Sequence, residues 1–139
     1  MASEPKTKPT DVPVTDFLAT VEHPTRRADG EVVRALLEDV SGEPAVMWGP
    51  SIVGFGSYRG STGDWPRLAF SPRKAELVVY LMQRFEGRDD MLARLGKHTL
   101  RGSCLCIKKL ADVDQGVLRE LATRTLEQMN AQYPQDRAA

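Results

Sequence analysis

The chain has 139 residues, which matches one ordinary domain and leaves little room for a second hydrophobic core. Hydrophobic residues make up 41% of the chain and charged residues 27%, a balance typical of globular proteins that excludes a disordered or fibrous class. Nineteen basic residues match nineteen acidic ones, so no overall field attracts nucleic acid or an anionic membrane. We therefore expect one domain, monomeric or homodimeric, that recognises its partner locally.

Two further features bear on location and redox state. No apolar stretch approaches the roughly 20 residues that span a bilayer, and the first residues lack the apolar core of a secretory signal. Cys104 and Cys106 are the only cysteines, and a bond between them would close almost no loop. We expect a cytoplasmic protein with reduced thiols.

The first elements are predicted to be a tail and two helices. Residues 1–13 contain three prolines and no apolar periodicity, which predicts a flexible tail before a single domain over 14–131; a second tail is expected over 132–139. An apolar stripe at helical spacing predicts a short helix that ends before Pro24. A second helix is predicted over 25–41, ended by Gly42. Its expected inward positions are Ala28, Val32, Ala35, Leu36 and Val40.

The middle of the chain changes to a strand pattern. Short segments rich in β-formers are separated by Gly, Pro or Ser, and the connections are too short for parallel crossovers. The sequence therefore predicts successive antiparallel hairpins. Their strands are expected over 44–48, 52–58, 65–70 and 75–81.

Helical spacing returns near the end of the chain. A short helix is predicted over 89–95, and the apolar segment 103–108 suits a central strand. Asp112 and Gln115 resemble a capping box before a long amphipathic helix. Together these elements predict an α+β fold, in which a largely antiparallel sheet of about five strands packs against helices, with a long C-terminal helix.

Four motifs in a fixed order resemble the YdhG-like family. They are GEPAVMWGPSIVGFGSY at 42–58, FSPRK at 70–74, GKH at 96–98, and SCL followed by IKKL at 103–110. The resemblance covers about residues 14–130. It implies a compact α+β fold without an established general activity, and it implies a frataxin-like iron chaperone as one possibility, because some relatives carry that label.

Basic residues from three separate segments suggest an anion site. Guanidinium and ammonium groups hold phosphate or carboxylate, and backbone amides near Gly96 and Gly102 would add a small anion nest. An indole and a phenol would stack on an apolar part of the ligand. The sequence thus predicts a noncatalytic binding protein for a small anionic ligand or a protein partner, without cofactor or metal. The predicted ligand-binding residues are Trp48, Ser51, Tyr58, Arg73, Lys74, Lys97, His98 and Lys108.

Simpler interpretations stay open beside this one. The basic residues also fit dispersed solubilising charges, and Trp48 also fits a core anchor beside a turn. Cys104 with His98 as nucleophile and base would make an enzyme, and a metal held by His98, Cys104 and Cys106 lacks further ligands. Iron would need clustered acids, but acidic residues on the second helix alternate with Arg34 and with apolar residues. The acids concerned are Glu31, Glu38, Asp39 and Glu43.

Overall fold

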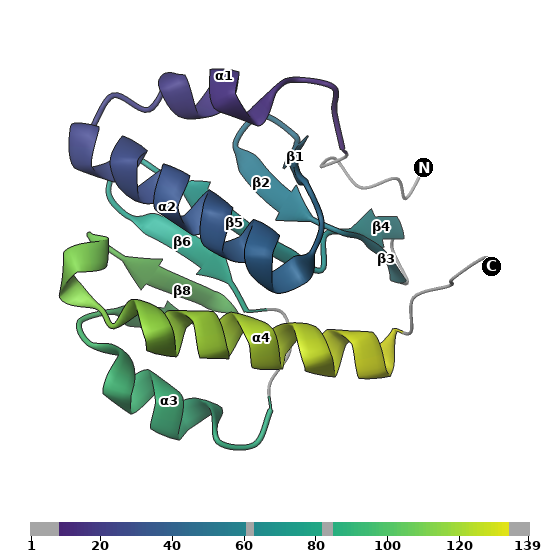
Figure 1. The fold of residues 1–139 in the computed structure, drawn as a ribbon, viewed down its shortest axis with the longest axis vertical. Coiled ribbons are helices and arrows are strands. Elements are labelled where there is room, and N and C mark those ends of the chain that lie inside the picture. Colours follow the sequence, from purple (N-terminus) through teal and green to yellow (C-terminus); the bar gives the residue numbers. More distant parts are fainter. Residues whose placement is uncertain (1–8, 61–62, 82–84, 134–139) are drawn as a thin grey trace.

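An antiparallel six-stranded sheet, backed by helices, forms the centre of the computed structural model, which describes residues 9–60, 63–81 and 85–133 (Figure 1). The strand order is β1-β2-β5-β6-β8-β7, and a separate hairpin pairs β3 with β4. These elements confirm the predicted α+β class and the long C-terminal helix. The strands are β1 Ala45–Trp48, β2 Ile52–Phe55, β3 Tyr58–Gly60, β4 Gly63–Trp65, β5 Leu68–Pro72, β6 Leu77–Tyr80, β7 Thr99–Arg101 and β8 Cys104–Ile107. The helices are α1 Val14–Ala19, α2 Pro24–Ser41, α3 Arg88–Leu95, the 3₁₀ turn Leu110–Asp112 and α4 Gln115–Gln132.

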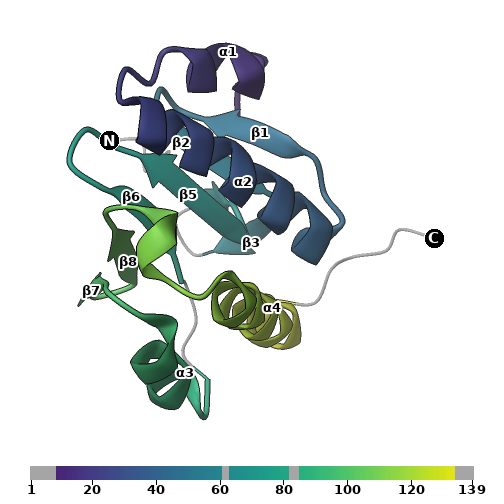
Figure 2. The same ribbon diagram turned by 60° about the vertical axis from the view of Figure 1, so that its left-hand side comes forward.

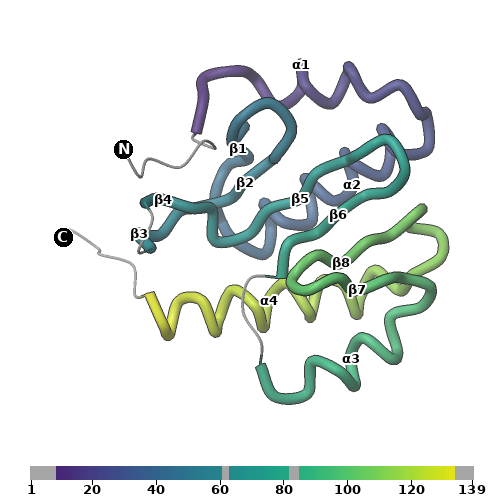
Figure 3. Tube along the Cα trace, turned by 180° about the vertical axis from the view of Figure 1, so that it is seen from behind, coloured from purple at the N-terminus to yellow at the C-terminus, as the bar shows by residue number. Residues whose placement is uncertain are grey.

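The sheet differs from the sequence prediction in two places. The expected strands over 52–58 and 65–70 each divide, because the chain turns at Gly56, whose φ is +67°, and leaves the main sheet to form the β3–β4 hairpin. That hairpin lies beyond the end of β2 and β5 in Figure 3. A short strand that the apolar pattern did not indicate, β7, pairs with β8, so that β8 lies between β6 and β7.

Both long helices cover the same face of the sheet. Figures 1 and 3 show α2 and α4 side by side on that face, with α3 beside α4. Side chains that point towards the helices, such as Phe55, Phe70 and Leu105, are fully buried in the main core. The residues that precede and follow them in the same strand point to the opposite face of the sheet. Trp48, Ala69, Val78 and Cys106 are buried there, outside the main core.

The buried stripe of α2 is not the one that the sequence predicted. Of the expected inward positions only Leu36 is buried, and Val32 is 40% exposed. The helix instead buries Arg26, Gly30, Val33, Leu36 and Leu37. The predicted orientation of the helix about its axis was wrong because Arg26 and Gly30 occupy inward positions. Gly30 leaves room for Leu18, which would lie 3.2 Å from an added Cβ.

The ends of the domain also differ in detail. Part of the predicted tail is ordered onto the edge of the sheet, where the Thr10 amide donates to the Met47 carbonyl over 2.7 Å. Predictions for residues 1–8 and 134–139 lie outside the described residues.

The N-cap of α4 is Asp114, whose carboxylate accepts from the Val117 amide, rather than Asp112, which lies in the preceding 3₁₀ turn. Within the described ranges, no helix combines the length and apolarity needed to cross a membrane.

Candidate anion-binding groove

A groove of about 680 Å³ lies where the α1–α2 connection meets two turns of the sheet. Figure 2 shows this connection and the β5–β6 turn at the same end of the molecule. One wall comes from α1 and the start of α2, and the other from the β1–β2 turn and the end of β5. The lining residues are Phe17, Thr20, Val21, Glu22, His23, Ser51, Ser71, Pro72, Arg73 and Lys74.

A buried guanidinium holds the turns beside this groove together. Arg26 is only 4% exposed, and it donates from Nη1 to the carbonyls of Lys74 over 2.6 Å and Arg73 over 3.3 Å. Its Nη2 donates to the carbonyl of Lys108 over 2.9 Å, while its buried Nε has no hydrogen-bond partner. One side chain of α2 therefore joins the β5–β6 turn to the end of β8.

Arg26 makes no direct ion pair with any of the described acids. Among the described residues no carboxylate forms an ion pair with it, and the nearby Asp29 accepts instead from the Leu110 amide over 3.0 Å. The first turn of α2 contains no acidic residue, although acids are favoured there because the N-terminal end of a helix is positive. The buried guanidinium and the N-terminal end of α2 are thus two positive groups at this end of the molecule, where Glu22 and Asp29 are the nearby acids.

Polar groups at the rim are arranged by short local bonds. The Arg73 amide closes the β5–β6 turn by donating to the Glu76 carbonyl, and its guanidinium donates to the Tyr80 hydroxyl over 2.7 Å. His23 caps α2, since its Nδ1 accepts from the Arg26 amide. In the neutral ring the proton is then on Nε2, which becomes a donor. Glu22 is the one acid of the lining.

The structure brings together part of the predicted ligand set. Ser51, Arg73 and Lys74 all line the groove, although they come from different turns. Lys108 is connected to the same end of the sheet through its carbonyl, which Arg26 binds. The other four predicted residues, Trp48, Tyr58, Lys97 and His98, do not line this groove.

Trp48 is a structural residue of the opposite sheet face rather than a platform for a ligand in the groove. Its indole is 2% exposed and lies against Gly54, where an added Cβ would stand 2.4 Å from Cδ1 and 2.6 Å from Nε1. Gly54 therefore provides the space that the indole fills.

Tyr58 belongs to the β3–β4 hairpin and contacts the end of α4. Its ring centroid lies 4.5 Å from that of Tyr133. Burial raises the pKa of the Tyr58 phenol, and the neighbouring Tyr133 raises this pKa further. The phenol therefore belongs to an aromatic contact that fastens the hairpin to α4.

After α3, the Lys97 amide and the His98 ring make local backbone contacts. The Lys97 amide donates to the Asp112 carbonyl over 3.1 Å, so it is not available for the predicted anion nest. The His98 ring bonds through Nδ1 with the Gly96 carbonyl over 2.8 Å. The nest prediction is therefore wrong at Lys97, because the chain uses this amide to attach the end of α3 to the 3₁₀ turn.

The cysteine environment disfavours a reactive thiolate. Cys106 is 3% exposed, and burial is the first cause that raises the pKa of its thiol, followed by a hydrogen bond to Glu76. Arg101 lies 3.1 Å from its Sγ and pairs with Glu76 over 2.6 Å, and hydrogen bonding to Arg101 lowers the pKa of the Glu76 carboxyl. No hydrogen bond joins Cys104 to His98 within the described part of the chain.

This environment predicts an order of thiol labelling. At pH 7.5 we expect iodoacetamide to modify the partly exposed Cys104 well before the buried Cys106. Because the Cys106 pKa is raised, its thiolate fraction and labelling rate should increase as the pH rises above the usual thiol pKa. Mass spectrometry of the Cys104→Ser and Cys106→Ser variants measures each site separately. Rapid labelling of Cys106 at neutral pH would contradict the buried, protonated thiol.

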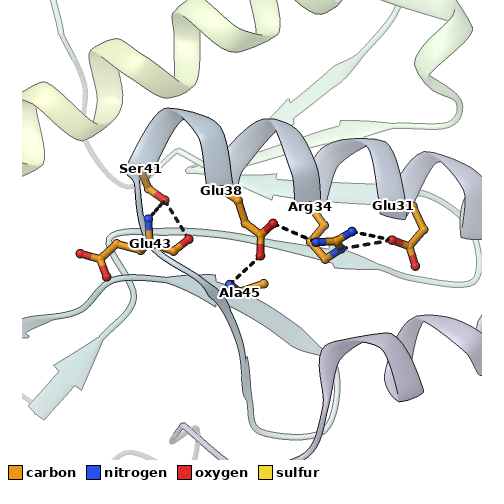
Figure 4. Close-up of polar contacts among 6 residues, drawn as sticks. All are labelled: Glu31, Arg34, Glu38, Ser41, Glu43 and Ala45. Atoms are coloured by element: carbon orange, nitrogen blue, oxygen red, sulfur yellow. Dashed lines mark hydrogen bonds and ion pairs between the residues drawn. The ribbon is translucent and has the colours of Figure 1, made fainter.

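Three of the four acids considered for iron, Glu31, Glu38 and Asp39, form ion pairs from α2. Figure 4 shows Arg34 between Glu31, at 3.1 Å, and Glu38, at 2.8 Å. The second oxygen of Glu38 accepts from the Ala45 amide. Asp39 pairs with Arg119 on α4. Among the described residues, no three His, Cys, Asp or Glu side chains are grouped so that they could hold a metal.

Comparison of the chain with protein-family models, curated proteins and solved structures gives no match. The YdhG-like resemblance therefore stays a prediction, and the candidate site depends on its own geometry. Sequence reasoning missed the contributions of Phe17, His23 and Arg26 to this site. Periodicity gave no signal for Arg26, which shares the buried side of α2 with Gly30 and Val33.

Proposed function

We propose that this protein is a noncatalytic, cytoplasmic binding protein of the YdhG-like type that holds a small anionic ligand in the groove beside Arg73 and Lys74. The observation that carries the proposal is the buried Arg26, whose guanidinium donates to main-chain carbonyls of the β5–β6 turn and of Lys108. A buried charge without a direct ion pair is costly, and an anion in the adjacent groove would reduce that cost.

The rim supplies the groups that would contact the anion. Arg73 and Lys74 are exposed, so their charges can reorient towards a ligand without breaking a buried ion pair. Each charge-assisted hydrogen bond that they form would contribute about 1.5–3 kcal/mol. The Nε2–H of His23 and the positive end of α2 add further favourable interactions.

A protein partner is the other occupant suggested by the sequence, and the structure gives it less support. Docking surfaces expose broad apolar patches, whereas the large exposed hydrophobic residues of the described chain are Val12 and Val32. Val32 lies on α2 and Val12 precedes α1, outside the lining of the groove. The hollow form of the site, within the size range of small-molecule pockets, favours a small ligand.

Removing the two rim charges tests the proposal. Inorganic phosphate serves as the probe, titrated into ¹⁵N-labelled protein at low salt. We expect the double variant Arg73→Ala/Lys74→Ala to bind phosphate at least tenfold more weakly than the parent, because about 1.5–3 kcal/mol is lost with each charge-assisted bond. Its thermal midpoint without phosphate should change by no more than a few degrees, since both side chains are exposed.

Lys97→Ala is the matched control for this experiment. Lys97 is an exposed lysine of a neighbouring segment that does not line the groove. It should therefore leave phosphate affinity unchanged, and the chemical-shift changes in the parent should centre on the amides of His23, Arg73 and Lys74. Equal affinity in the double variant and the parent, or an equal loss in Lys97→Ala, would remove the proposed site.

A further inference from the structure

The groove continues from its cationic end onto apolar surface. Away from Arg73 and Lys74, its lining includes Phe17 and Val21 from the α1 region and Pro72 from the end of β5. A compact anion such as phosphate would contact only the cationic end. The remaining volume therefore suits a ligand with an uncharged body.

A second hollow extends this apolar surface beyond α1. It has a volume of about 350 Å³, and it shares Phe17 and Thr20 with the groove. Its other lining residues come from the segment before α1, from α1 itself, and from the β1–β2 turn. They are Val12, Asp16, Met47, Gly49 and Pro50. Phe17 therefore separates two adjoining hollows, of which only the first has cations in its lining.

We propose that the ligand of this groove is an aliphatic carboxylic acid, whose carboxylate lies at Arg73 and Lys74 and whose hydrocarbon chain runs along Phe17 towards the second hollow. This inference rests on the proposed anion-binding function and specifies its ligand class. Polar ligands such as nucleotides fit less well, because the side chains of Phe17, Val21 and Pro72 offer no hydrogen-bond partners. The lining holds two cations, Arg73 and Lys74, and one acid, Glu22. A ligand with several negative charges is therefore disfavoured relative to one with a single carboxylate.

Charge and chain length make separate contributions to the affinity expected for such a ligand. The carboxylate accepts charge-assisted bonds, as phosphate does. Each methylene that enters apolar surface adds up to about fourfold in affinity when it is fully buried, and less in an open groove. Affinity should therefore increase steadily along a series of straight-chain acids that share one head group.

The experiment titrates the full chain with acetate, butyrate, hexanoate and octanoate, and separately with inorganic phosphate, by calorimetry and by ¹⁵N chemical shifts. Octanoate is expected to bind at least tenfold more tightly than butyrate. Phe17→Ala should weaken octanoate binding at least fivefold and leave phosphate binding unchanged. Val32→Ser, at an exposed valine outside both hollows, should change neither.

The outcomes show whether anion binding, the ligand class, or both are wrong. If phosphate binds at the rim but octanoate binds no more tightly than butyrate, the ligand class is wrong and anion binding stands. If neither probe binds, both proposals fail. Octanoate binding that is insensitive to Phe17→Ala and to Arg73→Ala/Lys74→Ala also overturns the inference, because the acid then binds elsewhere. Should Phe17→Ala fail to fold, Val21→Ser tests the same wall of the groove.

Discussion

Replacing Gly96 by alanine is expected to lower the free energy of unfolding by about 3–5 kcal/mol. Gly96 has φ +118° and ψ −155°, a region that is essentially restricted to glycine. An added Cβ would lie 2.3 Å from the Asp112 carbonyl oxygen and 3.0 Å from the Val113 Cα, both of which belong to the backbone. Overpacking against a backbone costs more than contact with a flexible side chain, because it shifts the 3₁₀ turn as a whole.

Gly102→Ala is the matched control for this prediction. Gly102 also has a positive φ, of +61°, but no atom lies within 4 Å of the position that its Cβ would take. The substitution should therefore cost only the left-handed backbone penalty of about 1–2 kcal/mol. Urea unfolding followed by circular dichroism compares the two variants. Equal losses at both glycines would show that the contact with Asp112 does not constrain the segment.

The elements of this fold follow closely from local sequence pattern. Apolar periodicity indicated the positions of α1, α2, α3 and α4, and the glycine that ends α2 adopts the left-handed conformation that its place predicts. Strand boundaries were less predictable. Gly56 and Ser57 lie inside the segment predicted as one strand, and their presence alone does not show that the chain leaves the main sheet there, because that departure depends on one backbone angle.

The phase of α2 illustrates a different limit. Counting apolar residues gave an inward stripe through Val32, yet the sheet accepts the face that contains Arg26 and Gly30. Helical periodicity alone predicts that a valine faces the core and an arginine faces solvent. Arg26 is buried instead because three carbonyls from distant segments accept its hydrogen bonds. The most informative residue of the candidate site was missed for the same reason.

The candidate site was only partly predictable because sequence distance does not specify which turns meet. Arg73 and Lys74 were identified from their charge, and Ser51 from its place in a motif, and these three line one groove. Lys97 and His98 belong to another segment of the fold, where backbone bonds to the 3₁₀ turn and to Gly96 hold them. Trp48 was expected beside the cations, but strand alternation directs it to the face opposite the helices.

Replacing Arg26 by methionine is expected to lower the free energy of unfolding by about 2–4 kcal/mol. The variant keeps an unbranched side chain but leaves the carbonyls of Arg73, Lys74 and Lys108 without their donor, and an unsatisfied buried acceptor costs about 1–3 kcal/mol. Part of that cost is offset, because methionine needs no desolvation of a charge. The loss should be measured by urea unfolding at neutral pH.

Arg27→Met is the matched control on the next position of the same helix. Arg27 is exposed and its guanidinium donates to the Val21 carbonyl, so its loss should change stability by no more than about 0.5 kcal/mol. Hydrogen exchange adds a local measurement, since without Arg26 the amides of the β5–β6 turn and of 108–112 should exchange faster than those of β1 and β2. If Arg26→Met and Arg27→Met unfold at the same urea concentration, Arg26 does not hold these turns together, and the positive end of the groove has lost its structural basis.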